Sequence, residues 1–180
     1  TPNWKWIVML YKHTAKLYKY AGVGGWNDPD MLEVGNGKLT YEQNKSHFSV
    51  WCMLAAPLIL GNDLRTVKQD VLDIVTNKNL IAINQDPLGR QAKVVKRQGS
   101  IDILAKPLSD GKTAICIFNT SKSAKKKVTV DLEKIVNDDY VKMNHKDSYT
   151  LVDQWGDENI TCNGKFSTSI NGYGVKVYIV

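Results

Sequence analysis

Apolar side chains recur at intervals of three or four positions in two stretches of the first half of the chain. Residues 4–20 carry them on one helical face, at Trp6, Ile7, Leu10, Leu17 and Tyr18. Residues 40–56 open with Thr40 and Gln43, the spacing of a capping box, and continue one apolar face through Phe48, Trp51, Cys52 and Ala55 until Pro57. A third helix is predicted over residues 67–75. The first half is therefore predicted to be rich in helix.

Two short extended segments lie between these helices. Residues 26–32 follow a glycine-rich approach, and residues 58–60 are wholly apolar. Helices that alternate with short apolar strands indicate βα units around a parallel sheet that is buried on both faces. Such units cannot close a barrel by themselves, so we expect this half to be part of a larger barrel.

The pattern changes after about residue 90, where short strands alternate with turns. Strands are predicted over residues 92–99, 100–108, 112–120, 126–132, 149–155, 164–170 and 174–180. Their spacing of roughly ten residues is typical of an antiparallel sandwich. We therefore expect two packed domains, residues 1–90 with α/β character and residues 91–180 with all-β character.

Charge and composition exclude some classes of protein. The 180 residues carry a net charge of +6, with 43% hydrophobic and 23% charged residues, as in ordinary globular proteins. Basic residues cluster at 94–98 and 121–128, and the second cluster is interpreted as a solvated hairpin, so no nucleic-acid partner is expected. No apolar run approaches the roughly 20 residues that span a bilayer, and no signal peptide is visible. A cytoplasmic location is the default expectation, although the N-terminus looks truncated.

Cysteine and histidine do not form a pattern typical of metal sites. Cys52, Cys116 and Cys162 are widely spaced, and the first two lie in apolar runs, which favours reduced structural thiols. His47 is predicted to be a packed or surface side chain rather than a ligand. We expect no metal and no cofactor.

Two acidic residues, Asp28 and Asp30, are candidates for sugar chemistry. Retaining glycosidases hold two carboxyl groups about 5 Å apart, and inverting ones hold them roughly 6.5–9.5 Å apart, on opposite sides of the scissile bond. Neighbours on one strand cannot easily flank a sugar in this way. Asp28, beside Pro29, is better explained as a turn residue that accepts backbone N–H groups, whereas Asp30 is a candidate for a functional role.

Three motifs carry a resemblance to a known family. They are AGVGGWNDPDMLEVGNG (residues 21–37), LAAPLILGNDLR (residues 54–65) and IAINQDPLGRQ (residues 81–91). Together they resemble the melibiase-type α-galactosidases, glycoside hydrolase family twenty-seven, which also includes α-N-acetylgalactosaminidases. The β-rich remainder resembles that family's C-terminal domain in pattern only. Val23 departs from the proline that the family usually has there.

The resemblance implies a fold and a site. It implies the last part of a (β/α)₈ TIM barrel followed by a C-terminal antiparallel β-sandwich, with the substrate held at the carboxyl ends of the barrel strands. It implies that Asp30 and Met31 contact the sugar, with Trp26 as a weaker candidate. The family's nucleophile and acid/base, both aspartates, are expected upstream of this chain, so no catalytic residue is expected within it.

Two further groups of residues have structural explanations. Asn62 and Asp63 follow a predicted barrel strand, where functional residues occur, but they also suit the N-cap of the next helix, which is the favoured interpretation. The sandwich aromatics could stack on sugars, but a place in the core is favoured: Tyr149, Trp155, Phe166 and Tyr173.

The resemblance predicts a retaining glycosidase that releases terminal α-linked galactose, with this chain supplying one wall of the site. The expected partner is an α-galactoside; no membrane partner is expected, and an oligomer is possible. The alternative is an inactive barrel remnant that serves as a structural or carbohydrate-binding module. Alone, the chain is expected to be inactive.

Overall fold

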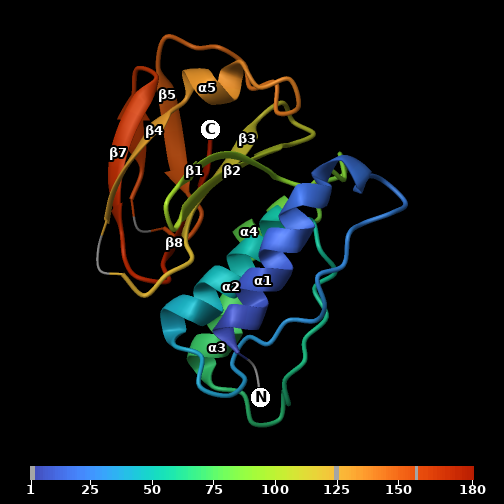
Figure 1. The fold of residues 1–180 in the computed structure, drawn as a ribbon. Coiled ribbons are helices and arrows are strands. Elements are labelled where there is room, and N and C mark those ends of the chain that lie inside the picture. The colour runs from blue at the N-terminus through green and yellow to red at the C-terminus, as the bar shows by residue number, and fades with distance from the viewer. Residues whose placement is uncertain (1–2, 124–125, 157) are drawn as a thin grey trace.

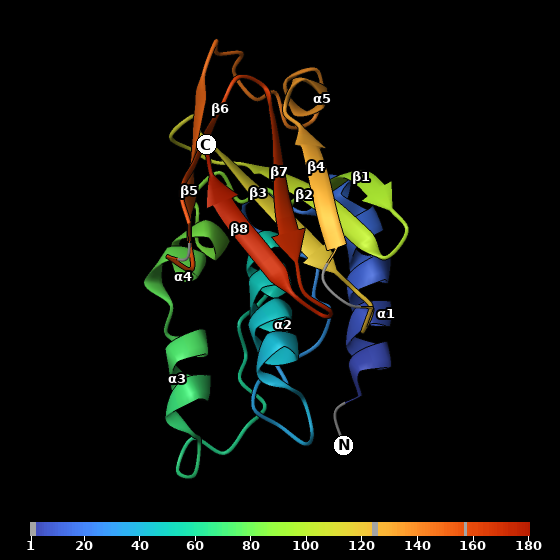
Figure 2. The same ribbon diagram turned by 90° about the vertical axis from the view of Figure 1, so that its left-hand side faces the viewer.

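The computed structural model describes residues 3–123, 126–156 and 158–180. Helices from the first half gather on one side and strands from the second half on the other (Figures 1 and 2). The helical part comprises α1 (Trp4–Thr14), the 3₁₀ helix η1 (Ala15–Tyr20), α2 (Tyr41–Met53), α3 (Gln69–Val75) and α4 (Lys78–Asn84). None of the helices in the described residues is both long and apolar enough to cross a membrane.

The predicted helix over residues 4–20 forms as two segments, α1 and η1. The side-chain oxygen of Asn3 caps α1 by accepting a hydrogen bond from the Lys5 N–H at 2.9 Å. Ile7, Tyr11 and Thr14 are buried, which is the helical spacing that the apolar pattern indicated. The helix tightens into 3₁₀ geometry at Ala15, as helix ends commonly do.

Helix α2 is the most enclosed element of the helical part. It lies between α1 and α3 and beneath the sheet (Figure 2), and ten of its residues, from Gln43 to Met53, are buried. The predicted capping box is confirmed: the Thr40 hydroxyl accepts from the Gln43 N–H, and the Gln43 side chain accepts from the Thr40 N–H at 2.8 Å. Both orphan donors at the start of the helix are thereby satisfied.

Replacing Thr40 by alanine should lower the free energy of unfolding by about 1 kcal/mol, the usual cost of losing an N-cap side chain. Thr40→Ser keeps the hydroxyl and should lose much less. Urea unfolding of the two variants measures the difference. Equal losses would show that the cap hydrogen bond does not contribute.

The two predicted barrel strands are shorter than expected. Only Leu32 and Leu60 pair, in a single parallel bridge. The Leu32 N–H donates to the Ile59 carbonyl and the Gly61 N–H to the Leu32 carbonyl, both at 2.8 Å. The parallel direction is as predicted, but Pro29 has no N–H to donate, and Asp30 has a positive φ that breaks the extended path.

Two features of the helical part differ from expectation. The predicted N-cap role of Asn62 and Asp63 is wrong, because α3 begins at Gln69 with Lys68 at its N-cap. Asp63 instead closes a turn, with its carboxylate accepting from the Arg65 N–H at 3.0 Å. Helix α4 was not predicted, because its apolar positions are too few to distinguish a helix from a buried strand.

The second half forms two antiparallel sheets, as predicted. Six strands follow the order β1-β2-β3-β8-β5-β6, and β4 pairs with β7 in the second sheet. The bounds are β1 (Lys93–Gln98), β2 (Ile101–Pro107), β3 (Thr113–Asn119), β4 (Lys126–Asp131), β5 (Tyr149–Asp153), β6 (Ile160–Cys162), β7 (Lys165–Ile170) and β8 (Val175–Ile179). Strand β6 and the short helix α5 (Glu133–Val136) are additional to the prediction. Ala124 and Lys125, part of the predicted basic hairpin, lie outside the described residues.

The six-stranded sheet separates two hydrophobic cores. Along β3, Ala114, Cys116 and Phe118 pack into the core shared with the helices, whereas Ile115 and Ile117 pack toward β4 and β7. Because both faces are covered, every residue of β2 and β3 is buried. The expectation that the two halves are packed together is confirmed, although the division at residue 90 stays a prediction.

Side chains that were considered for other roles lie in this interior. Tyr149 is buried, the Trp155 indole N–H donates to the Ser49 hydroxyl of α2 at 3.1 Å, and Tyr173 packs edge-on against Trp4. The core interpretation is thus confirmed for Tyr149 and Phe166, and Trp155 packs against the core shared with the helices, whereas Tyr173 is half-buried and belongs to neither core. Cys52 and Cys116 are buried free thiols whose pKa values are raised by desolvation, as expected of structural cysteines.

Candidate functional site

Asp30 and Met31 lie next to one another in an exposed stretch that enters the Leu32–Leu60 bridge. They line a hollow of about 350 Å³ together with Glu33, the α1 N-cap Asn3 and residues of α1 and α2: Trp6, Ile7, Leu10, His47 and Trp51. Met31 is 45% exposed and Trp6 is 61% exposed, so this face presents apolar side chains to its surroundings. The structure brings together the two residues that the resemblance singled out most strongly.

Met31 fits closely against the neighbouring strand. A side chain at Gly61 would place its Cβ 2.7 Å from the Met31 sulfur and 3.1 Å from the Leu32 carbonyl oxygen. Only glycine therefore permits this approach without movement of its neighbours. The glycine that follows the predicted strand of residues 58–60 thus leaves the space that the Met31 side chain occupies.

Asp30 adopts a backbone conformation that is unusual for a residue with a side chain. Its φ is +81°, in the region that costs a non-glycine residue roughly 1–2 kcal/mol. One carboxylate oxygen, Oδ1, accepts from the Met31 N–H at 2.7 Å. The other, Oδ2, has no hydrogen-bond partner among the described residues. Asp30 can therefore offer one oxygen to a ligand, and strain of this kind concentrates at functional sites.

Asp28 has the turn role that the sequence predicted. Its Oδ1 accepts from the Asp30 N–H at 2.9 Å, which closes a turn over Pro29. Asp28 and Asp30 are thus joined through the backbone of Asp30. The interpretation of Asp28 as a turn acceptor is confirmed.

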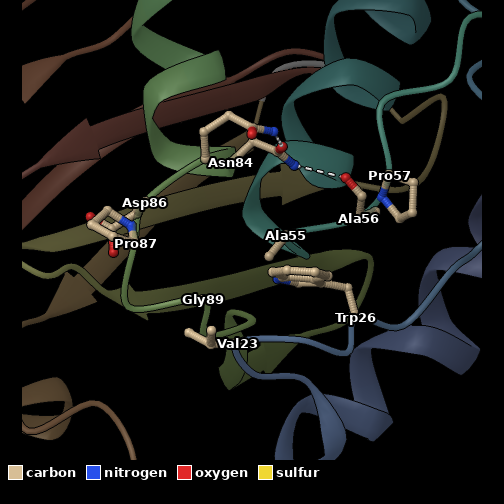
Figure 3. Close-up of a pocket in the computed structure, with 10 residues that line it drawn as sticks. Val23, Trp26, Ala55, Ala56, Pro57, Asn84, Asp86, Pro87 and Gly89 are labelled. Carbon is tan, nitrogen blue, oxygen red and sulfur yellow. Dashed lines mark hydrogen bonds between the residues drawn. The ribbon is translucent and has the colours of Figure 1, made fainter.

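Trp26 lies in a different hollow. It lines a cavity of about 520 Å³ with Val23, the segment Ala55–Pro57 and the segment after α4, and its ring lies beside Ala55 (Figure 3). The polar groups at this cavity are already bonded within the chain: Asn84 donates to the Ala56 carbonyl at 2.9 Å, and Asp86 accepts from Ser109. The structure therefore does not bring Trp26 to Asp30 and Met31, and its sugar-contacting role stays a prediction.

His47 is completely buried beneath this segment. Its Nε2 accepts from the Glu33 N–H at 3.0 Å, so the imidazole is neutral and its proton lies on Nδ1. Burial lowers the pKa of His47 to about 3. Nδ1 has no hydrogen-bond partner among the described residues. The packed interpretation of His47 is confirmed, and the described residues contain no group of three or more potential metal ligands.

His47 should make the folded chain sensitive to acid. The unfolded chain takes up a proton at the ordinary pKa of 6.5, whereas the folded chain takes it up only near 3. Over this interval the unfolded state binds more protons, so the free energy of unfolding falls as pH falls, by up to about 1.4 kcal/mol per pH unit.

Urea unfolding of the wild type and of His47→Gln between pH 7 and pH 4 measures this effect. Glutamine can still accept from the Glu33 N–H but does not titrate, so the variant should lose less stability on acidification. The carboxylates are common to both proteins and cancel in the comparison. Parallel pH profiles would contradict a buried neutral His47.

Sequence reasoning missed two residues that hold this segment in place. The Trp51 indole N–H donates to the Asp30 carbonyl at 2.9 Å, and the Asn27 side-chain amide donates to the Leu17 carbonyl and to the Gln91 side chain, both at 2.8 Å. Trp51 was placed on the apolar face of its helix. The available signal was that a buried indole N–H needs an acceptor.

Comparison with known proteins accounts for nearly all of the chain. Residues 3–86 match the family described as alpha galactosidase A, and residues 98–180 match the alpha galactosidase C-terminal beta sandwich domain. Alpha-galactosidase 2 of Arabidopsis thaliana is 37% identical over 98% of this chain and 43% of its own length. The alpha-galactosidase of Cyamopsis tetragonoloba is 36% identical over 99% of this chain and 42% of its own length.

Solved structures show the same fold. The crystal structure of alpha-galactosidase I from Mortierella vinacea superposes with a TM-score of 0.87 at 27% identity, over 96% of this chain and 44% of that one. The chain spans less than half the length of these relatives. It belongs to the melibiase-type α-galactosidase family, of which it carries the end of the barrel and the C-terminal β-sandwich.

Proposed function

We propose that this chain supplies one wall of the sugar site of a retaining glycosidase that releases terminal α-linked galactose. The observation that carries the proposal is the pair Asp30 and Met31, exposed side by side, with Asp30 held in a left-handed conformation and its Oδ2 without a hydrogen-bond partner in the part of the chain that the structure describes. A free carboxylate oxygen beside an apolar side chain suits a sugar, whose hydroxyl groups donate hydrogen bonds while its C–H face packs on apolar surface.

The two catalytic carboxylates, in this proposal, belong to sequence that this chain does not contain. Asp28 cannot be the partner of Asp30, because it is committed to the turn that places Asp30. A nucleophile and an acid/base must approach the anomeric centre from opposite sides, about 5 Å apart in a retaining enzyme. In this arrangement Asp30 binds ring hydroxyls and does not take part in covalent chemistry.

The face around Asp30 supports an arrangement in which further barrel structure covers it. Trp6, Met31 and Ile59 are 45–61% exposed, and the buried His47 Nδ1–H has no acceptor among the described residues. A buried donor without a partner is uncommon in a complete structure. The relatives, more than twice as long as their matching regions, contain the additional sequence that such a cover would need.

The experiment compares two proteins on an aryl α-galactoside. The first is the 180-residue chain. The second, called the fusion below, joins the part of the Cyamopsis tetragonoloba α-galactosidase that this chain does not match to the start of this chain. We expect no turnover by the chain alone and clear turnover by the fusion.

Two results would overturn the proposal. Turnover by the chain alone, lost in Asp30→Ala, would place the catalytic groups within these 180 residues. A fusion that folds and stays inactive would show that this chain does not supply a wall of the sugar site. That result would favour the alternative, a barrel remnant with a structural or carbohydrate-binding role. Circular dichroism and size-exclusion chromatography establish folding in each case.

A further inference from the structure

The left-handed conformation of Asp30 is maintained from outside its own segment. An L-residue leaves this region unless surrounding contacts hold it there. Within the segment, the Asp28 carboxylate accepts from the Asp30 N–H at 2.9 Å. On the other side of the residue, the Asp30 carbonyl accepts from the Trp51 indole N–H, also at 2.9 Å. The peptide groups on both sides of the Asp30 Cα are therefore fixed.

Trp51 is a rigid donor. Its side chain is completely buried in the last turn of α2, a helix that is capped at its start and enclosed by α1, α3 and the sheet. The His47 ring packs edge-on against the Trp51 ring at a centroid distance of 4.2 Å. An indole held in this way keeps the direction of its N–H group. The packing of α2 therefore determines where the Asp30 carbonyl lies.

Helix α2 holds the segment at a second point three residues later. His47, one turn before Trp51, accepts from the Glu33 N–H at 3.0 Å. Between these points lies Met31, whose N–H donates to Asp30 Oδ1. The two contacts from α2 thus lie on both sides of Met31, and the Met31 N–H occupies Oδ1 of Asp30, so Oδ2 is the carboxylate oxygen without a partner among the described residues.

We propose that Trp51 and Asp28 are positioning residues: they hold Asp30 in its left-handed conformation, and this conformation directs Oδ2 to the sugar. Neither residue contacts the sugar in this scheme. The functional half rests on the proposed function above, whereas the conformational half concerns this chain alone.

The conformational half is tested on the 180-residue chain by NMR. Trp51→Phe keeps an aromatic ring but removes the N–H, and the three-bond HN–Hα coupling and the backbone shifts of Asp30 report its φ. The matched control is Trp155→Phe, which removes another indole N–H donor to α2, the one that bonds Ser49 and does not reach Asp30. We expect the Asp30 signals to change in Trp51→Phe and to stay unchanged in Trp155→Phe.

The functional half is tested in the fusion. Loss of a hydrogen bond of this kind should lower kcat/KM for the aryl α-galactoside about tenfold in Trp51→Phe, with a rise in KM, and by less than about twofold in Trp155→Phe. Asp28 offers a second pair of variants should Trp51→Phe fail to fold. Asp28→Asn keeps an oxygen that accepts from the Asp30 N–H and should retain activity, whereas Asp28→Ala should lose it.

Each outcome decides a different part of the proposal. Unchanged Asp30 signals in both Trp51→Phe and Asp28→Ala would overturn the inference, whatever the fusion does. Changed Asp30 signals with unchanged kcat/KM would show that the conformation does not serve the reaction, and would overturn it as well. An inactive wild-type fusion with changed Asp30 signals would overturn the proposed function and the functional half, and would support the conformational half.

Discussion

Replacing Asp102 by alanine should lower the free energy of unfolding by about 2–4 kcal/mol, as expected when a buried hydroxyl loses its acceptor and a half-exposed ion pair is removed. Asp102 is 1% exposed on β2. Its carboxylate accepts from the Tyr11 hydroxyl of α1 at 2.9 Å and from the Arg97 guanidinium at 2.6 and 3.0 Å. The variant leaves a buried hydroxyl without its acceptor and a guanidinium without its counter-ion.

The network joins the two halves of the molecule. Tyr11 belongs to the helical part, and Asp102 and Arg97 belong to the sandwich. Burial, together with the adjacent Asp102 carboxylate, raises the pKa of Tyr11 well above its ordinary value, so its hydroxyl remains a donor through the neutral range. The Arg97 side chain is 49% exposed, so solvent weakens the contribution of its ion pair with Asp102 to stability. The hydrogen bond from the Tyr11 hydroxyl should therefore account for much of the stability lost in Asp102→Ala.

Urea unfolding of Asp102→Ala and Tyr11→Phe measures these contributions. Tyr11→Phe should lose less than Asp102→Ala, because Arg97 still pairs with the carboxylate. Asp110→Ala is the matched control, since its ion pair with Lys112 is solvent-exposed and should contribute less than about 1 kcal/mol. A loss in Asp102→Ala no larger than in the control would contradict a structural role for the network.

Replacing Asp30 by alanine should lower kcat/KM of the fusion by about a hundredfold, as expected when a charged hydrogen-bond acceptor for a substrate is removed. The reason lies in the geometry of the carboxylate: Oδ1 is occupied by the Met31 N–H, and Oδ2 is the oxygen left for a sugar hydroxyl. Stability should fall only slightly: Asp30 is exposed, but alanine keeps the positive φ, tolerates it less well than aspartate and loses the bond from the Met31 N–H.

Steady-state kinetics and thermal unfolding of the same preparations separate the two effects. Asp30→Asn keeps the side-chain shape but removes the charge, so it should retain more activity than Asp30→Ala. Asp110→Ala, on a distant turn of the sandwich, should leave the kinetics unchanged. Activity that survives in Asp30→Ala at the wild-type level would exclude Asp30 from the sugar site.

The sequence by itself determined the local structure of most of the chain. Thr40 and Gln43 specified the start of α2, because a capping box satisfies backbone donors within four residues. Alternating and wholly apolar runs located seven of the eight strands, since side chains on a strand alternate between faces. Asp28 was placed correctly as a turn acceptor, because the carboxylate, the proline and the accepted N–H all lie within three residues.

Only the tertiary structure decided how distant segments meet. Trp51 was placed on the apolar face of its helix from sequence, and its bond to the Asp30 carbonyl, 21 residues away, depends on how α2 packs beneath that segment. The positive φ of Asp30 depends on that packing too, because no local preference of aspartate compels it. Trp26 and Asp30 are four residues apart in sequence and line different hollows, because the chain between them turns at Asp28 and Pro29. Short-range hydrogen bonds and side-chain periodicity are encoded in neighbouring residues, whereas the geometry of a site depends on contacts between elements that the sequence does not order in space.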